Sequence, residues 1–299
     1  MLWIINGLIY GFFTALYTLV NQKRHFNGYV LGVWRGFGIA LLFAPWLMTM
    51  PLLKDWRSWL LLIAQGIFIG VYDSHIFFAS ARFGANNTSR LLVLSVLLTT
   101  ILWWGITPQK FLQLFEDANV FITLMLCIIG FCICYWYMLQ SNVNRQAFIY
   151  MLPAIFALAF MSVATKEISV INDSVWHGII YYLTVATSIS GVYNLLLLIK
   201  TKTRQQTWRE MVFAPSVIQT GLYIVGFSTV LIIAKTLALR ISPNPGYVVA
   251  LLLTAPIFVY VLSPQYKKRE QLSEKAGWAM LFFLSLIMLL VSSNIGIND

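Results

Sequence analysis

The sequence predicts an all-α membrane protein with ten transmembrane helices, arranged as two inverted repeats of five helices. Three observations lead to this prediction. Hydrophobic residues make up 60% of the chain and charged residues only 10%, whereas a soluble domain carries about 25% charge. Ten separate apolar runs are long enough to cross a bilayer. Finally, one half of the chain aligns with the other.

Each apolar run is continuous over about 20 residues, the length that a helix needs to cross the hydrocarbon core. Strands of a membrane barrel are about half as long and alternate between apolar and polar residues. The first run has no basic segment before it and no small-residue cleavage site, so we interpret it as a span rather than a secretory signal. The predicted spans are 2–20, 29–50, 58–81, 88–106, 119–139, 147–166, 176–199, 213–235, 245–263 and 277–295.

The self-similarity defines the two halves. Residues 60–104 align without a gap on residues 215–259, so that Gly66 falls on Gly221. The end of the first span aligns in the same way with the end of the sixth. We therefore expect one repeat in residues 1–143 and the other in residues 144–299. Because each half has an odd number of helices, the two copies must cross the membrane in opposite directions.

The distribution of Lys and Arg indicates how the chain is oriented in the membrane, rather than nucleic-acid binding. The formal net charge is +10, but Lys and Arg lie in the short connections between spans, as membrane orientation requires, so no nucleic-acid partner is expected. The odd-numbered connections carry most of these cations, and both termini lack them. The positive-inside rule therefore favours both termini outside the cell.

Motifs for enzyme chemistry are absent from the sequence. It has no His-Glu-x-x-His, no Gly-x-Ser-x-Gly and no phosphate-binding Gly-x-x-x-x-Gly-Lys-Ser/Thr, so we expect neither an enzyme nor an ATP-driven pump. The three cysteines fall in one apolar run, and their spacing fits neither a disulfide framework nor a zinc site. We expect no cofactor and no metal.

Several weak motifs occur along the chain, and two of them, the lysines and the helix breaks, occur in both halves. The motifs are Lys23 and Lys166 at the ends of the first helices, Arg35 within Trp34-Arg35-Gly36, the helix breaks at 83–87 and 241–245, and Pro256 in the ninth span. Together with ten helices in about 300 residues, these features resemble the drug/metabolite transporter superfamily, and more narrowly its EamA-type carriers. The chain departs from that pattern in the fourth span, where Thr100 or Ile101 stands at a position often held by Pro.

The resemblance implies a central cavity between the halves. Its lining would come from the first, third and fourth helices and from the sixth, eighth and ninth, with the fifth and tenth at the periphery. It also implies that both termini lie in the cytoplasm, which is opposite to the side that the charge count favours.

The strongest candidate for a functional residue is Asp73, in the third span, because ionisable groups inside a membrane are costly. Its carboxylate can attract a cationic substrate or carry a coupling proton. Alternatively, it pairs with Arg35 to hold two helices together, or it lies at a helix end that faces the cytosol. His75 can relay a proton, although two residues along a helix turn it away from Asp73. Arg35 can bind a substrate carboxylate or phosphate through two hydrogen bonds from its guanidinium, or extend its charge toward the membrane surface.

A polar stripe follows the first span at spacings of four, four and three residues, which place its members on one face of a helix. It consists of Asn6, Tyr10, Thr14 and Tyr17. Such a stripe lines a ligand cavity or is an ordinary helix interface. Tyr223 in the eighth span is a weaker candidate for the cavity lining. We interpret Lys235 and Arg82 as flanks that end the third helix of each half.

The predicted function is that of a secondary transporter in the cytoplasmic membrane, surrounded by lipid. It would move a small polar metabolite, such as an amino acid, an amine or a nucleobase-like solute, by alternating access. Proton or exchange coupling would use Asp73. The alternatives are a flippase for a lipid-linked substrate and a non-transporting membrane enzyme or assembly protein.

Overall fold

The computed structural model describes residues 2–112, 118–139, 142–172, 174–201, 207–242 and 244–263, together with 275, 278–279, 281–283 and 285–286. Within these residues the chain forms helices joined by short turns, with no strand. The elements are α1 (Leu2–Arg24), α2 (Gly28–Thr49), α3 (Trp56–Phe83), α4 (Ala85–Leu92), α5 (Ser95–Ile106), α6 (Pro108–Leu112), α7 (Ala118–Leu139), α8 (Asn142–Ile171), α9 (Val175–Tyr181), η2 (Tyr182–Ala186), α10 (Thr187–Thr201), α11 (Trp208–Val212), α12 (Pro215–Ile241), α13 (Pro245–Ala250), η3 (Leu251–Leu253) and α14 (Thr254–Leu262).

Eight stretches of the described chain are long and apolar enough to cross a membrane, which supports a multi-pass membrane protein. They are Leu2–Gln22, Gly28–Thr49, Trp56–Phe83, Ala85–Ile106, Arg145–Ile171, Val175–Thr201, Pro215–Ile241 and Pro245–Leu262. The expected fifth span coincides with α7, whose apolar stretch Phe121–Tyr137 is shorter than these eight. Most of the expected tenth span, 277–295, lies outside the described residues.

Local sequence explains where several helices begin and end. Asp55 and Asn244 accept hydrogen bonds from backbone N–H groups at the starts of α3 and α13, and Pro245 provides the fixed backbone angle suited to a first helical position. Gly84 has a φ of 86° and separates α3 from α4, as only glycine does without steric cost. The expected break at 83–87 is therefore a one-residue interruption, and Asn86 and Asn87 lie within α4.

Two helices extend further than the sequence predicted, which changes the interpretation of their lysines. The expected sixth and eighth spans ended at Lys166 and Lys235, but α8 continues to Ile171 and α12 to Ile241. Both lysines are consequently inside helices and buried, so the interpretation of Lys235 as a flank was wrong. The ammonium of Lys166 donates to the backbone oxygens of Leu239 (2.8 Å) and Ser242 (2.5 Å). It thereby satisfies carbonyl groups that the end of α12 leaves unpaired.

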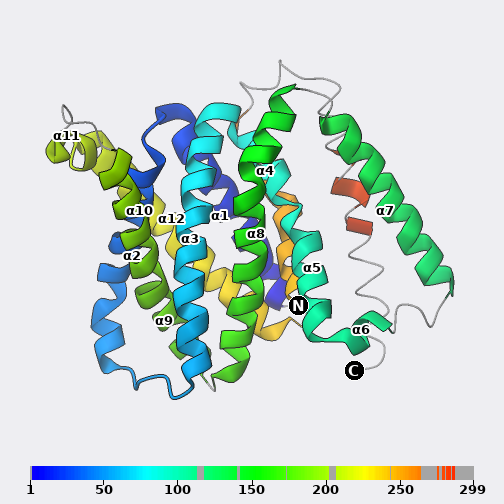
Figure 1. Cartoon of the computed structure of the whole chain (residues 1–299), viewed down its shortest axis with the longest axis horizontal. Coiled ribbons are helices and arrows are strands. Elements are labelled where there is room, and N and C mark those ends of the chain that lie inside the picture. The colour runs from blue at the N-terminus through cyan, green and yellow to red at the C-terminus, as the bar shows by residue number, and fades with distance from the viewer. Residues whose placement is uncertain are drawn as a thin grey trace.

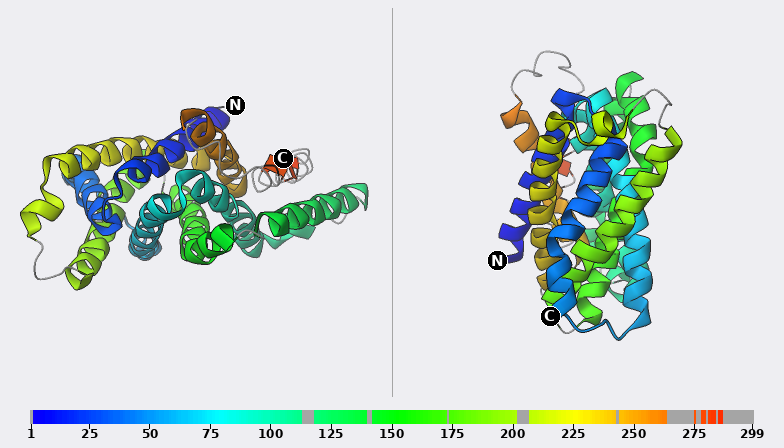
Figure 2. Two further views of the ribbon diagram at one scale, coloured as in Figure 1. Left: turned by 90° about the horizontal axis from the view of Figure 1, so that it is seen from above. Right: turned by 90° about the vertical axis from the view of Figure 1, so that its left-hand side faces the viewer.

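The helices form two rows, with a pair of helices closing one end (Figures 1 and 2). Seen from above, α12, α1 and α14 make one row, and α3, α8 and α5 make the other (Figure 2). The most extensive helix contacts within and between these groups are α1 with α12, α3 with α8, and α2 with α10. The helices α2 and α10 stand at one end, and α7 lies at the opposite end beside α8 (Figure 1).

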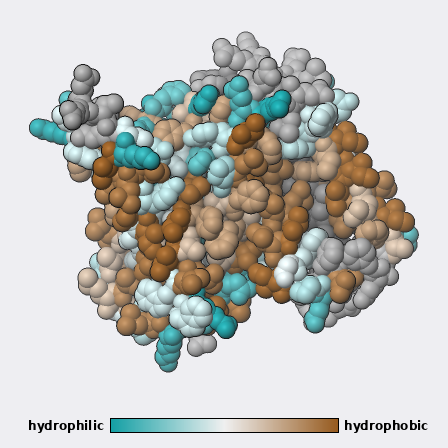
Figure 3. Space-filling view, in the orientation of Figure 1, coloured by the Kyte–Doolittle hydropathy of each residue, from teal (hydrophilic) through white to brown (hydrophobic). Residues whose placement is uncertain are grey.

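The outer surface suits a lipid environment. Hydrophilic residues gather toward the two ends of the helices, and the band between them is mainly hydrophobic (Figure 3). Large apolar side chains are exposed on successive turns of α1 and α2, among them Ile5, Leu41 and Met48. Water would penalise such exposure, whereas lipid chains do not.

Candidate functional site

The centre of the candidate site is Asp73, which lies inside α3 and is completely buried. Both of its carboxylate oxygens are engaged. Oδ1 accepts a hydrogen bond of 2.6 Å from the hydroxyl of Tyr17 on α1. Oδ2 forms an ion pair of 2.5 Å with Nη1 of Arg35 on α2, and the hydroxyl of Ser190 on α10 donates to it at 3.5 Å. Asp73 therefore joins four helices that are distant in sequence.

Arg35 is buried as deeply as its partner, with a side chain that is 4% exposed. Its guanidinium carbon lies 5.6 Å from the centre of the Tyr17 ring, so the ring face adds a favourable contact to the ion pair. Its Nε has no hydrogen-bond partner among the residues that the structure describes. The cation is thus compensated by Asp73, but one of its donors is unused.

A second buried cation is Lys235 on α12. It is 2% exposed, and its ammonium lies 5.7 Å from the centre of the Tyr10 ring on α1. It interacts electrostatically with Arg35. The ion pair between Arg35 and Asp73 is the single one in the described part of the chain, so no described carboxylate pairs with Lys235.

Tyrosines enclose the charged groups. Tyr72 on α3 and Tyr182 in η2 are buried and lie within electrostatic range of both Arg35 and Asp73. Tyr10 is 1% exposed, and its hydroxyl has no hydrogen-bond partner within the described chain. η2 is a single π-helical turn, a feature that frequently occurs at functional sites, and it packs against α2 and α3.

The structure brings together four of the eight candidates predicted from sequence, and a fifth lies beside them. Asp73, Arg35 and Tyr17 are in direct contact, and Tyr10 lies beside Lys235. Thr14 is buried on the same face of α1, but its hydroxyl donates to the backbone oxygen of Tyr10, as is usual inside helices.

The other three candidates lie elsewhere. His75 is turned away from Asp73 toward α8: its Nδ1 is 2.8 Å from the backbone oxygen of Val71, and its ring packs against Tyr150 at 5.1 Å. The side-chain amide of Asn6 donates to the backbone oxygen of Leu2 near the exposed end of α1. Tyr223 is half-exposed and stacks on Phe227.

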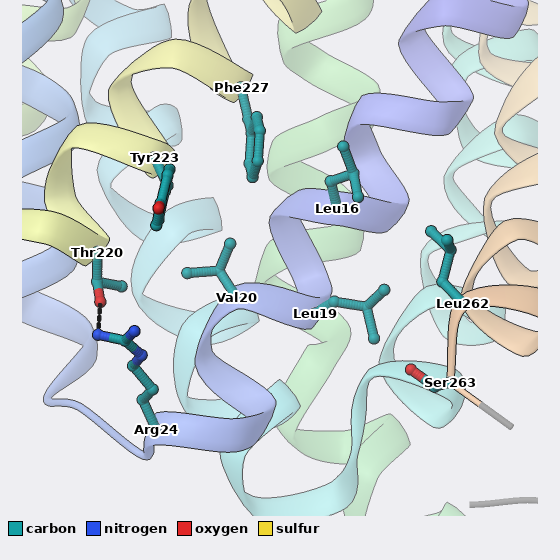
Figure 4. Close-up of a pocket in the computed structure, with 9 residues that line it drawn as sticks. All are labelled: Leu16, Leu19, Val20, Arg24, Thr220, Tyr223, Phe227, Leu262 and Ser263. Atoms are coloured by element: carbon teal, nitrogen blue, oxygen red, sulfur yellow. Dashed lines mark hydrogen bonds between the residues drawn. The ribbon is translucent and has the colours of Figure 1, made fainter. Parts of the chain in front are cut away.

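Tyr223 lines a separate groove on another face of α1 (Figure 4). The groove has a volume of about 230 Å³. Its walls are mainly apolar side chains from α1 and α12 and the end of α14, and Arg24 lies at one end, where it donates to the hydroxyl of Thr220 at 3.0 Å. The lining residues are Leu16, Leu19, Val20, Arg24, Thr220, Tyr223, Phe227, Leu262 and Ser263.

Sequence reasoning missed several members of the central cluster. Lys235 carried a signal, because it is a charged residue in an apolar segment, but the predicted span ended at it. Tyr72, Tyr182 and Ser190 carried none, since tyrosines and serines are common in membrane helices. The alignment of the halves offers one clue for Ser190, which lies 155 residues after Arg35, the same spacing as Gly66 and Gly221.

Ser74 and His75 do not have the geometry of a nucleophile and its general base. Ser74 and His75 are 3.5 Å apart, but the hydroxyl of Ser74 donates to the backbone oxygen of Val71, and the facing ring nitrogen lies at hydrogen-bond distance from the same oxygen. A general base would need that nitrogen free to take the proton from serine.

Comparison of the sequence with models of known families gives no match, and comparison with curated proteins gives none either.

Proposed function

We propose that this chain is a secondary transporter of a small polar metabolite, built from two inverted five-helix repeats that alternately open a central site to either side of the membrane. The observation that supports this most is the buried cluster of Asp73, Arg35 and Lys235, supplied by three helices. Ionisable groups inside membrane proteins mark substrate and ion pathways because their burial is otherwise costly.

The pattern of helix contacts supports the inverted repeat. With α8 as the counterpart of α1 and α12 as the counterpart of α3, exchanging the halves turns the contact of α1 with α12 into the contact of α8 with α3. Both contacts are among the most extensive in the protein. The second helices of the two halves, α2 and α10, pack against each other. A two-fold relation between the halves produces this pattern.

Glycine contacts support the same relation at the level of residues. On α3, Gly66 lies against Ile189, and on α12, Gly221 lies against Trp34. Gly66 and Gly221 are 155 residues apart, and so are Trp34 and Ile189, so the two contacts are one contact repeated. The contacts of Gly70 with Tyr193 and of Gly38 with Val225 are related in the same way.

One glycine contact joins two positions that are equivalent in the two halves. Gly36 on α2 meets Gly191 on α10 so closely that a Cβ built on Gly36 would lie 2.4 Å from the Cα of Gly191. These two positions are also 155 residues apart. Equivalent residues touch one another only where they lie beside a two-fold axis. Small residues at such a crossing let membrane helices approach closely.

The two proposed repeats carry different charges. At the same spacing of 155 residues, Ser190 replaces Arg35 and Ser228 replaces Asp73. The ion pair therefore lies in the first half, with buried hydroxyls at the equivalent places in the second. In our proposal the halves rock about this asymmetric cluster, and movement of the halves exposes it to each side in turn.

The proposal is tested by metabolite movement. Cells expressing the chain are compared with cells expressing the double variant Asp73→Asn/Arg35→Gln, which removes the ion pair without leaving either partner as a lone charge. The intracellular and extracellular metabolites are measured by mass spectrometry, and any changed metabolite is then followed in proteoliposomes. We expect at least one solute to move with the wild-type chain and not with the double variant. Identical metabolite profiles for the two folded proteins contradict a carrier.

A flippase for a lipid-linked substrate is the second candidate, and the groove in Figure 4 favours it. The groove is lined by apolar side chains and has a cation, Arg24, at one end, which suits a lipid chain with a polar head. Transfer of a fluorescent phospholipid between leaflets of proteoliposomes, followed by chemical quenching of the outer leaflet, distinguishes this function from movement of a water-soluble solute.

A further inference from the structure

The central cluster has more positive than negative charge. Arg35 and Lys235 each carry one positive charge and Asp73 one negative charge, so the three groups leave a net charge of +1 when all are ionised. They are 3%, 2% and 0% exposed, so solvent does not compensate the excess. In the interior of a membrane protein a buried ammonium is costly, and an anionic ligand beside it stabilises the charged form.

Both carboxylate oxygens of Asp73 are already engaged, which disfavours a cationic ligand there. One of its oxygens accepts from Tyr17, and the other accepts from Arg35 and Ser190. An amine that took the place of Arg35 would leave that guanidinium buried without a counter-charge. The expectation that the carboxylate attracts a cationic substrate is therefore disfavoured in this conformation.

Donor groups, in contrast, are unused. The hydroxyl of Tyr10, the Nε of Arg35 and the hydroxyl of Ser228 have no hydrogen-bond partner among the described residues, and all three side chains are more than nine-tenths buried. Lys235 contributes an ammonium beside the Tyr10 ring. The guanidinium and the ammonium are donors only, and the hydroxyls can also donate. Such a set of groups recognises oxyanions, with which charged donors make their strongest hydrogen bonds.

We propose that the cluster is a binding site for an organic monocarboxylate, whose carboxylate is held by Lys235 and Tyr10 with the Nε of Arg35 beside it. One negative charge neutralises the excess of +1, whereas a phosphate dianion would leave the site negative. The buried rings of Tyr10, Tyr17, Tyr72 and Tyr182 suit an apolar or aromatic body on the acid. The inference rests on the proposed carrier function, because the enclosed cluster becomes accessible when the halves move.

The test uses four ring compounds that differ in one group: benzoate, the neutral benzamide, the cationic benzylamine, and phenyl phosphate. The melting temperature of the purified full-length chain in detergent is measured with each compound at concentrations up to about 20 mM, since a ligand of the folded state raises it by mass action. We expect benzoate alone to raise it, by about 3 °C at the highest concentration.

The variants test which residues hold the carboxylate. Lys235→Met removes the ammonium at similar volume, and we expect it to weaken benzoate binding at least about tenfold. Its melting temperature without ligand should not fall, because an uncompensated buried charge is lost. Lys54→Met is the matched control, since Lys54 is exposed and remote from the cluster. Tyr10→Phe keeps the ring, removes the hydroxyl, and should weaken binding about threefold to tenfold.

Stabilisation by benzoate that persists in Lys54→Met and is lost in Lys235→Met supports the site. If Lys235→Met fails to fold, the reduced response of Tyr10→Phe decides the question. Equal stabilisation by benzylamine or benzamide overturns the proposal, and so does a benzoate response that Lys235→Met retains. A larger response to phenyl phosphate overturns the assignment to a monocarboxylate. An absence of any benzoate response in folded wild-type protein overturns it as well.

Failure of this inference differs from failure of the carrier. A benzoate response that depends on Lys235, without solute movement in proteoliposomes, leaves the anion site standing and refutes transport. Movement of an amine in proteoliposomes, without a benzoate response, keeps the carrier and refutes the anion site.

Discussion

Replacing Asp73 by asparagine should destabilise the protein because it leaves Arg35 buried without its counter-charge. The two side chains are 0% and 4% exposed, so water does not screen the change. An asparagine oxygen can still accept from Tyr17, so the main loss is the ion pair itself. Removing one partner of a buried pair costs about 3–5 kcal/mol. We therefore expect Asp73→Asn to lower the free energy of unfolding by about that amount.

The double variant Asp73→Asn/Arg35→Gln provides the test of this reasoning. With both charges removed, neither member of the pair is left buried as a lone charge, so the double variant should recover at least about half of the loss. Asp55→Asn is the matched control, because Asp55 caps α3 through a backbone N–H and asparagine caps equally well. The free energy of unfolding is measured by titrating denaturing detergent into mixed micelles. A single variant as stable as Asp55→Asn, or a double variant no better than the single one, refutes the account.

Three further predictions concern packing, capping and the histidine. Gly221→Val should destabilise the protein by about 1–3 kcal/mol, since a Cβ there would lie 2.6 Å from the Trp34 ring; thermal unfolding should show no such loss for Gly226→Ala on the same helix, where nothing lies within 4 Å. Lys166→Met should cost about 2–3 kcal/mol, because buried carbonyls at the end of α12 lose a charged donor, whereas Lys54→Met should be neutral in the same assay. His75→Phe should preserve the ring contact with Tyr150, and any solute movement found in proteoliposomes should continue at a similar rate; abolished movement in a folded His75→Phe protein would restore the proton-relay hypothesis.

The sequence predicted the helical membrane character of the chain because apolar runs of about 20 residues report directly on the bilayer. It also placed the short break after Phe83, where Gly84 takes a positive φ. Helix ends were less predictable. The charges of Lys166 and Lys235 suggested the ends of spans, but tertiary packing buries both lysines and the helices continue to Ile171 and Ile241.

The extension of helices also accounts for the change in the alignment offset between the two halves. The end of the first helix aligns with the sixth at an offset of 143 residues, whereas the second and third helices align at 155. The difference lies in α8 and α9. α8 continues beyond the equivalent of the end of α1, and α9 begins before the equivalent of the start of α2. Such extensions of a helix cannot be recognised from the amino-acid composition, because the added turns contain the same kinds of apolar and polar residues as the segments around them.

The candidate site was predicted in part. An intramembrane carboxylate is conspicuous in a sequence, and so is the stripe that contains Tyr10 and Tyr17. Their partners are not, because Ser190 and Tyr182 reach Asp73 and Arg35 through tertiary contacts between segments more than 100 residues apart. The sequence analysis left open whether Asp73 pairs with Arg35, and the geometry adds that pair. This ion pair does not exclude a role for Asp73 in transport, since Arg35 also interacts electrostatically with Lys235.

Access to the cluster from both sides of the membrane tests the central claim most directly. Ser228 lies 155 residues after Asp73, the spacing at which the two halves align, and is completely buried. Ser228→Cys is introduced into a chain whose three natural cysteines are replaced by alanine, and a membrane-impermeant thiol reagent is applied to right-side-out and inside-out vesicles. An alternating-access carrier predicts labelling from both sides, each rate changing when a bound ligand shifts the halves. Labelling from one side alone, or from neither, would contradict the account.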